Sequence, residues 1–243
     1  MTVGHLERDR VAEVIAEEMC GAGPPEVPQR LCDAVMQLLP VSGAGLSLRG
    51  DGMPVPLGAS GERAARVMEI EVTLGDGPCL EAAGSGSMVC APDLLSNRDA
   101  FRWPVFAQQA SAAGVRSVYA LPLGDRALCV GTLDLYRDVP GELTADEVRT
   151  ARVVAEVLTA ALLALSRVAP QDAENLGHGL SPLAAEHDEV YQAVGMVMAQ
   201  LGVPADEALS LLRGHAFAKD RTVLELAHEV VAQRTRFDGH PIV

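Results

Sequence analysis

The sequence predicts an α+β fold: an antiparallel sheet with flanking helices, joined by a long helix and a linker to a C-terminal three-helix bundle. The first observation is a series of short apolar or alternating runs before residue 137, separated by glycine, proline, aspartate and asparagine. The second is a long helical pattern at 144–167 that is apolar almost all round. The third is the last fifth of the chain, where three helical patterns follow one another with only short turns between them.

Composition sets the first limits on function. The 243 residues are enough for two domains, and 49% of them are hydrophobic. No apolar run approaches the roughly 20 residues needed to span a bilayer, and the charged N-terminus lacks the apolar core of a signal peptide. We therefore expect a cytoplasmic protein without membrane contact. The net charge of −14 excludes a general coat for nucleic acid, although five basic residues in 180–243 leave room for a local positive face.

The cysteines and histidines predict neither disulfides nor a metal site. Five cysteines, an odd number, are widely spaced in apolar surroundings with no Cys-x-x-Cys pair. Core packing in a reducing compartment is the simpler interpretation, and a redox-sensing thiol at Cys79 is the alternative. The histidines form no His-x-x-x-His pair, so we expect no metal and no cofactor.

Hydrophobic periodicity locates the elements of the first domain. Helices are expected at 6–20 and 28–39. The expected strands are 44–48, 53–59, 87–91, 115–123 and 127–136, with residues 121–135 forming a hairpin. The expected helices between strands are 62–70, 78–83 and 104–113. Because strands follow one another directly and helices interrupt them only at intervals, the pattern favours an antiparallel sheet.

A long helix follows the last strand. Thr144 and Glu147 form a capping box, and the helical pattern continues to about Arg167. Such an apolar helix must be covered on several sides, so we expect the sheet on one side and a partner subunit on the other. This predicts a homodimer formed through the N-terminal helices and the helix at 144–167.

The C-terminal bundle has clear helix boundaries. The first helix is expected from Val190 to Leu201, and Gly202 ends it. The second begins at 204–207, with proline and carboxylates in its first turn. The third begins at the capping box of Thr222 and Glu225. A compact bundle of this kind at the end of a longer chain is typical of an input or output module.

Several motifs in the strand-rich part resemble one known family. They are Gly75-Asp76-Gly77-Pro78-Cys79-Leu80-Glu81-Ala82, the run 89–93, Trp103-Pro104-Val105-Phe106, the run 114–123 and Gly131-Thr132-Leu133-Asp134-Leu135-Tyr136. As a set, covering about residues 30–168, they strongly resemble the GAF domains of actinobacterial regulators. The resemblance implies a sensor domain that responds to an input, with a small molecule as a candidate ligand whose binding residues stay unknown.

The C-terminal bundle resembles a second family. Its motifs are Gln192-Ala193-Val194-Gly195-Met196, Glu207-Ala208, Leu211-Leu212-Arg213, Ala216-Phe217-Ala218 and the run 226–231. They resemble the ANTAR domain, a three-helix module that binds paired hairpin loops in nascent transcripts and prevents terminator formation. Together the two resemblances imply a transcription antitermination regulator. They divide the chain into a GAF sensor domain with its N-terminal helices and long helix (1–168), a linker (169–179), an ANTAR domain (180–236) and a tail (237–243).

The ANTAR resemblance implies a set of RNA-binding residues. Phosphates would be contacted by Arg213, Lys219 and Arg221. Splayed loop bases would stack on His215 and Phe217. Gly195 would allow close backbone approach, and Gln192 would read a base edge. This chain departs from many ANTAR sequences at two places, where His187 and Val194 stand in place of an arginine and a lysine. Protonation of His187 would restore one charge.

Other interpretations of these residues stay open. Phe217 also fits as a core aromatic between the second and third bundle helices, and Arg213 as a cation favoured by the dipole at a helix end. The bundle as a whole also fits a signalling or dimerisation module that binds a protein partner instead of RNA.

The acidic residues of the first domain do not predict an enzyme. Asp76, Glu81, Asp93 and Asp134 stand without a histidine nearby in the sequence, so no nucleophile, base and orienting group assemble. The segment 75–78 is better interpreted as a turn into a helix whose N-terminus is suited to an anion.

Overall fold

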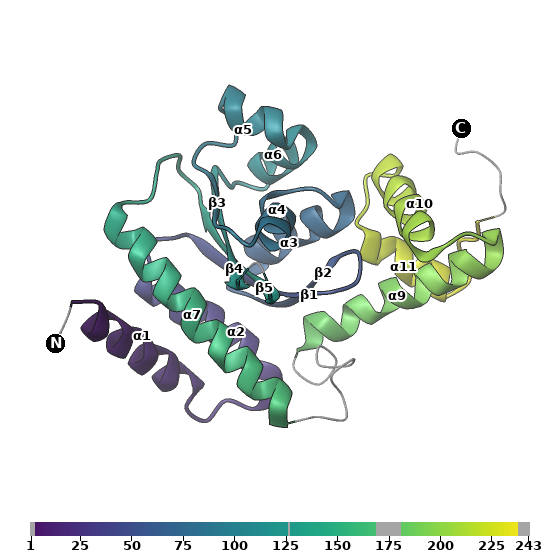
Figure 1. The fold of residues 1–243 in the computed structure, drawn as a ribbon. Coiled ribbons are helices and arrows are strands. Elements are labelled where there is room, and N and C mark those ends of the chain that lie inside the picture. Colours follow the sequence, from purple (N-terminus) through teal and green to yellow (C-terminus); the bar gives the residue numbers. More distant parts are fainter. Residues whose placement is uncertain (1–2, 126, 169–180, 238–243) are drawn as a thin grey trace.

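The computed structural model describes residues 3–125, 127–168 and 181–237, and it confirms the α+β class (Figure 1). At its centre is a five-stranded antiparallel sheet with the strand order β2-β1-β5-β4-β3. The strands are β1 (Gly43–Arg49), β2 (Pro54–Ala59), β3 (Val89–Ala91), β4 (Ser117–Gly124) and β5 (Cys129–Arg137). The predicted hairpin is confirmed, since β4 and β5 pair along their whole length.

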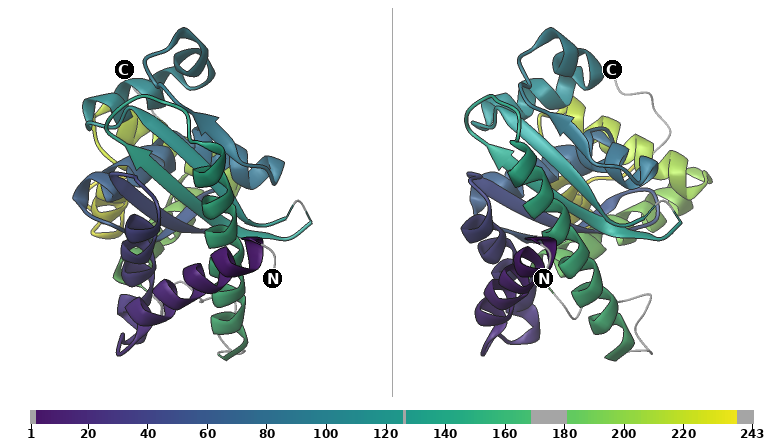
Figure 2. Two further views of the ribbon diagram at one scale, coloured as in Figure 1. Left: turned by 90° about the vertical axis from the view of Figure 1, so that its left-hand side faces the viewer. Right: turned by 60° about the vertical axis from the view of Figure 1, so that its left-hand side comes forward.

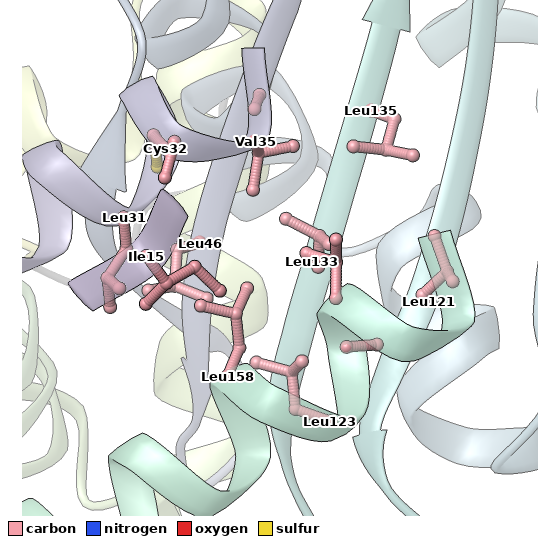
Figure 3. Close-up of a cluster of buried hydrophobic side chains, with 14 of the residues drawn as sticks. Ile15, Leu31, Cys32, Val35, Leu46, Leu121, Leu123, Leu133, Leu135 and Leu158 are labelled. Atoms are coloured by element: carbon pink, nitrogen blue, oxygen red, sulfur yellow. The ribbon is translucent and has the colours of Figure 1, made fainter. Parts of the chain in front are cut away.

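One face of the sheet is covered by the N-terminal helices and the long helix. These are α1 (Val3–Met19), α2 (Val27–Leu38) and α7 (Ala145–Val168), with a 3-10 turn at Pro24–Glu26 between α1 and α2. Figure 2 shows them together on the same side of the strands. Their apolar side chains interlock with alternate strand residues such as Leu46, Leu133 and Leu135, which are fully buried (Figure 3).

The opposite face carries four shorter helices. They are α3 (Glu62–Leu74), α4 (Pro78–Ser85), α5 (Asn97–Arg102) and α6 (Pro104–Ala112). Their core includes Phe106 and the intervening strand residue Val118. The sequence did not predict α5, because this six-residue helix has no apolar stripe; its N-cap Ser96 accepts a hydrogen bond from Asp99 N. Helix α3 is longer than predicted and ends where Gly75 takes a left-handed conformation (φ 66°).

The long helix α7 is covered within the chain, on a side for which the sequence predicted a partner subunit. Helix α1 lies beside it, where Thr150 donates a hydrogen bond to Glu7 and Arg8 pairs with Glu156. The sheet covers another side through fully buried residues such as Leu158 (Figure 3). The apolarity of α7 therefore does not require a second subunit at the surface that α1 occupies, and the homodimer stays a prediction.

The C-terminal bundle consists of α9 (Pro182–Leu201), α10 (Ala205–Ala218) and α11 (Val223–Val231). Helix α9 begins at Pro182 rather than Val190, because Ser181 caps it by accepting a hydrogen bond from Leu183 N. The predicted end of α9 at Gly202 (φ 69°) and the capping box of α11 are confirmed. Figure 1 shows the bundle beside α3 and the β1–β2 turn, on the side of the sheet domain away from α1.

The predicted linker at 169–179 lies outside the described residues, as do 238–243 of the predicted tail. Phe237, the first residue of that tail, packs on the bundle: its ring centroid lies 5.1 Å from that of His215, and its amide donates to Gln200.

Candidate nucleic-acid interface

Helix α9 presents a polar, open stripe to solvent. Gln192 and Gly195, one turn apart, are both exposed. A Cβ atom built on Gly195 would meet nothing within 4 Å. Glycine inside a helix costs roughly 1 kcal/mol relative to alanine, and packing within the described chain gives no reason for that cost. The surface at Gly195 is thus open to close approach by another molecule.

The end of α10 exposes an aromatic ring and a cation. The Phe217 side chain is 49% exposed, so the interpretation of Phe217 as a core aromatic is wrong. Lys219 is exposed two residues later. His215 lies against Phe237, and burial together with the nearby Lys219 charge lowers its pKa. This ring is therefore partly covered within the chain, while Phe217 and Lys219 face solvent.

Arg221 is held by the helix that follows it. Its guanidinium lies 2.8 Å from the Glu229 carboxylate and donates to the Glu225 carbonyl across 2.9 Å. The same group, with Phe217 and with Arg66 of α3, lines a hollow of about 290 Å³ between α3 and the bundle. A phosphate at Arg221 would therefore compete with carboxylates of α11, the helix that follows this residue.

Arg213 is engaged by the sheet domain. Its Nε donates to the carbonyl of Val72 across 2.9 Å, and an Nη donates to the carbonyl of Gly52 across 3.3 Å. Burial at this contact lowers the pKa of the guanidinium, which nevertheless stays charged. The contact needs glycine at Gly75, where a Cβ atom would lie 2.6 Å from Arg213 Nη1. The sequence did not predict this contact, and in this arrangement Arg213 does not face solvent freely.

Further polar contacts join the two parts along α3. The amide of Val223, an orphan donor at the start of α11, donates to Thr73 Oγ1 across 2.9 Å in a buried position. His187 is fully buried, with Nε2 2.7 Å from Glu69 Oε1 and Nδ1 2.8 Å from the Leu183 carbonyl. His187 therefore does not supply the exposed charge that the sequence suggested; burial lowers its pKa, but the Glu69 carboxylate outweighs this and the net shift is upward.

Apolar contacts complete the junction. Met53 of the β1–β2 turn and Val72 of α3 belong to the same buried cluster as Val190, Leu212 and Leu226 of the bundle. Each of the two sheet-domain side chains is at most 3% exposed. The core of the bundle is thus completed by the sheet domain. We call this junction the docking contact. It joins residues 52–53, 69, 72–73 and 75 of the sheet domain to residues 187, 213 and 223 of the bundle.

The opposite side of α3 faces a buried acidic cluster. Glu71 Oε1 accepts a hydrogen bond from Cys79 N at the start of α4, across 2.8 Å. The predicted anion site at this helix N-terminus is therefore occupied by a carboxylate of the chain itself. Cys79 Sγ lies 3.0 Å from Thr132 Oγ1, which in turn lies 3.4 Å from Asp134 Oδ2. Gly77 (φ 154°) is required here because a Cβ atom would lie 2.2 Å from Glu71 Oε1.

Burial raises the pKa of each acidic group in this cluster. It raises the pKa of Asp134 to about 7, and burial together with the Asp134 charge raises the pKa of Glu71 and of the Cys79 thiol well above their usual ranges. A thiol of this kind is a poor redox sensor, because the thiolate is the reactive form.

Of the other acids that the sequence singled out, Glu81 pairs with Arg102 and Asp93 with Arg116, while Asp76 is exposed.

Sequence reasoning missed Glu69 and Glu71. A glutamate in a helix is usually solvated, so its residue type alone does not indicate a buried site. One signal pointed to Glu71: it lies four residues after Val67 and three before Leu74, on the apolar stripe of α3. No comparable local signal existed for Glu69, whose partner His187 lies 118 positions later in the chain.

The architecture, a helix-flanked antiparallel sheet with a three-helix bundle docked on it, is that of a sensor domain followed by an output module. The GAF domain family matches residues 24–162 and the ANTAR domain family matches residues 183–231. The chain thus belongs to the GAF family and carries an ANTAR domain after the GAF domain. Both are regulatory domains. Every helix in the described part of the chain is too short or too polar to span a bilayer.

Solved structures agree on the fold. The GAF domain of a phosphoenolpyruvate-protein phosphotransferase from Coxiella burnetii is 14% identical, with a TM-score of 0.52 over 70% of this chain and 99% of that one. The GAF domain of the Acinetobacter phosphoenolpyruvate-protein phosphotransferase is 12% identical, with a TM-score of 0.50 over 69% and 97%. At these identities the likeness shows the fold alone. No curated protein matches the sequence.

Proposed function

We propose that this protein is a cytoplasmic, homodimeric transcription antitermination regulator without enzymatic activity, whose ANTAR domain binds paired hairpin loops in nascent RNA. The observation that carries the proposal is the open surface of an ANTAR domain at Gln192 and Gly195 on α9 and at Phe217 and Lys219 on α10. Exposed aromatic rings stack on splayed loop bases, and exposed cations contact phosphates. The described fold leaves these four residues accessible.

The docking contact supports control of RNA binding by the GAF domain. Arg213 donates to two GAF carbonyls through Nε and Nη2, so these two donors cannot contact a phosphate without leaving the carbonyls. RNA binding and docking therefore compete for Arg213. An input to the GAF domain, such as a small molecule, would shift RNA affinity only by stabilising the docked and released forms to different degrees.

The direct test is a gel-shift titration of the full-length protein with two-hairpin RNA from candidate leader transcripts at low salt. We expect binding that weakens linearly in log affinity as log salt concentration rises. Replacing Lys219→Ala should weaken binding to all target sequences and reduce the salt slope by about 1. The matched control is Arg10→Ala, which removes one exposed cation from α1, on the far side of the sheet domain (Figure 1). Absence of binding by the folded wild-type protein in every ligand state would overturn the proposal.

One observation favours a second candidate function, binding of a protein partner by the bundle. Arg213 and Arg221 are both engaged within the chain, and Phe217 adds exposed apolar area. A pull-down in which the full-length wild-type protein recovers a protein partner but the Phe217→Ala variant does not, combined with indifference to RNA, would select this function. RNA binding that depends on Lys219 would select the first.

A further inference from the structure

Three ligand-type side chains meet in the buried cluster between α3, α4 and β5. One ligand atom from each of Glu71, Cys79 and Asp134 lies within 4.8 Å of the others. Ligand atoms of a tetrahedral metal site, each about 2.0–2.3 Å from the ion, lie roughly 3.3–3.7 Å apart. Binding one ion would therefore draw the three atoms together by no more than about 1.5 Å.

The carboxylates of this cluster have unused acceptor atoms. Glu71 and Asp134 are both fully buried, and Glu71 Oε2 and Asp134 Oδ1 have no hydrogen-bond partner among the described residues. Among residues 3–125, 127–168 and 181–237, no arginine, lysine or histidine forms an ion pair with Glu71 or Asp134. Buried polar atoms without a hydrogen-bond partner are costly, so two such carboxyl groups side by side point to a ligand that would pair with both of them.

The cluster also has space beside it. A cavity of about 180 Å³ is lined by Cys79 and Thr132 together with Met53 and Gly131. The Thr132 hydroxyl lies between the Cys79 sulfur and the Asp134 carboxylate, 3.0 Å from the first and 3.4 Å from the second. The cavity borders the cluster at Cys79 and Thr132 and gives room for a water or another ligand on that side.

We propose that Glu71, Cys79 and Asp134 bind one divalent transition-metal ion of the zinc or iron(II) class. The sulfur ligand disfavours Mg²⁺ and Ca²⁺, which take oxygen ligands, and favours softer divalent ions. Two carboxylates and one thiolate give three protein ligands, and the cavity supplies the open position found in reactive or ligand-binding metal sites. This site is separate from the RNA-binding surface, and its presence does not depend on the proposed function.

The test is a Co²⁺ titration of the full-length protein after removal of metals with a chelator. We expect a sulfur-to-Co²⁺ charge-transfer band in the near ultraviolet that saturates at one equivalent and disappears when Zn²⁺ displaces Co²⁺. Cys79→Ser should abolish this band. Cys90→Ser, which changes a half-buried cysteine of β3, is the matched control and should leave it unchanged. Asp134→Asn and Glu71→Gln should each weaken Co²⁺ binding about tenfold or more.

Two results would overturn the proposal. One is folded wild-type protein that gives no such band at any Co²⁺ concentration. The other is a Cys79→Ser protein that binds Co²⁺ with the wild-type spectrum and affinity. Circular dichroism establishes folding of each variant. If Cys79→Ser does not fold, Asp134→Asn decides, since it has the same shape as the wild-type side chain: unchanged affinity overturns the site and weakened affinity supports it.

Discussion

Arg213 Nε donates a hydrogen bond to the carbonyl of Val72 across 2.9 Å, although the two residues lie 141 positions apart in the chain. The next residue of α3, Thr73, accepts from Val223 N across 2.9 Å. One turn of one GAF helix therefore holds both the second and the third ANTAR helix. Because Glu71 precedes these two residues and faces the acidic cluster, α3 contacts the acidic cluster on one face and the ANTAR domain on the other.

The first prediction concerns Thr73→Val. The change removes the acceptor of the buried Val223 amide without altering any ANTAR residue. An unpaired buried donor costs about 1–3 kcal/mol, so the docked form should lose stability by an amount of that order. Hydrogen exchange of the Val223 amide should accelerate, and RNA affinity should rise because Arg213 is released. Thr159→Val makes the same chemical change on α7 and should alter neither quantity; an unchanged exchange rate in Thr73→Val would refute the importance of this bond.

The second prediction uses Gly75→Ala. Gly75 has φ 66°, and its added Cβ would lie 2.6 Å from Arg213 Nη1, so alanine should both strain the backbone and displace the guanidinium. Gly21→Ala separates the two effects, because Gly21 has φ 76° but nothing within 4 Å of its Cβ position. Both variants should lose roughly 1 kcal/mol of stability through the left-handed backbone. Only Gly75→Ala should also release the ANTAR domain, measured as faster hydrogen exchange in α11. Equal exchange in the two variants would show that Arg213 does not hold the docked form.

Local patterns explain what could be predicted from the sequence. The capping box of Thr222 and Glu225 involves residues three apart, so the start of α11 was visible directly. The β4–β5 hairpin was equally local. Helix α9 begins eight residues before the predicted start, because His187 and Glu186 precede the regular apolar stripe that the sequence shows from Val190. Only the tertiary contact with Glu69 shows why a histidine is buried at that position.

The docking contact could not be predicted, for a physical reason. Arg213 binds main-chain carbonyls, and a carbonyl is present at every residue, so no sequence pattern identifies Val72 or Gly52 as acceptors. The burial of Glu71 was also hard to predict, because an ionisable residue that falls within the apolar stripe of a helix is most often still exposed to solvent. Phe217 shows the opposite case, since an aromatic ring at the inner end of a helix was open to a core interpretation and the structure exposes it.

The third prediction is a pH dependence of docking through His187. Glu69, with a smaller contribution from Glu186, raises the pKa of His187 against the opposing effect of burial. A histidine whose pKa is raised by folding stabilises the folded form below its unfolded pKa of about 6.5, and that contribution is lost as the pH rises through the folded pKa. The docked form should therefore be more stable near pH 6 than near pH 9. Glu69→Gln should flatten this difference in urea unfolding followed by a probe of α9. A wild-type protein with the same pH profile as Glu69→Gln would contradict the assignment.

The last prediction separates helix stability from RNA contact at Gly195. A Cβ at this position meets nothing within 4 Å, and the residue lies inside α9, so Gly195→Ala should stabilise the folded protein by roughly 1 kcal/mol. If RNA approaches the α9 backbone there, the same methyl group should weaken RNA binding despite the greater stability. Gly84→Ala is the matched control: it also meets nothing within 4 Å, but it lies in the GAF helix α4 and should leave RNA affinity unchanged. Thermal unfolding and gel-shift titration of both variants measure the two quantities. A more stable Gly195→Ala protein with undiminished RNA affinity would show that RNA does not approach the α9 backbone at this position. The RNA-binding surface would then lie away from α9, toward Phe217 and Lys219.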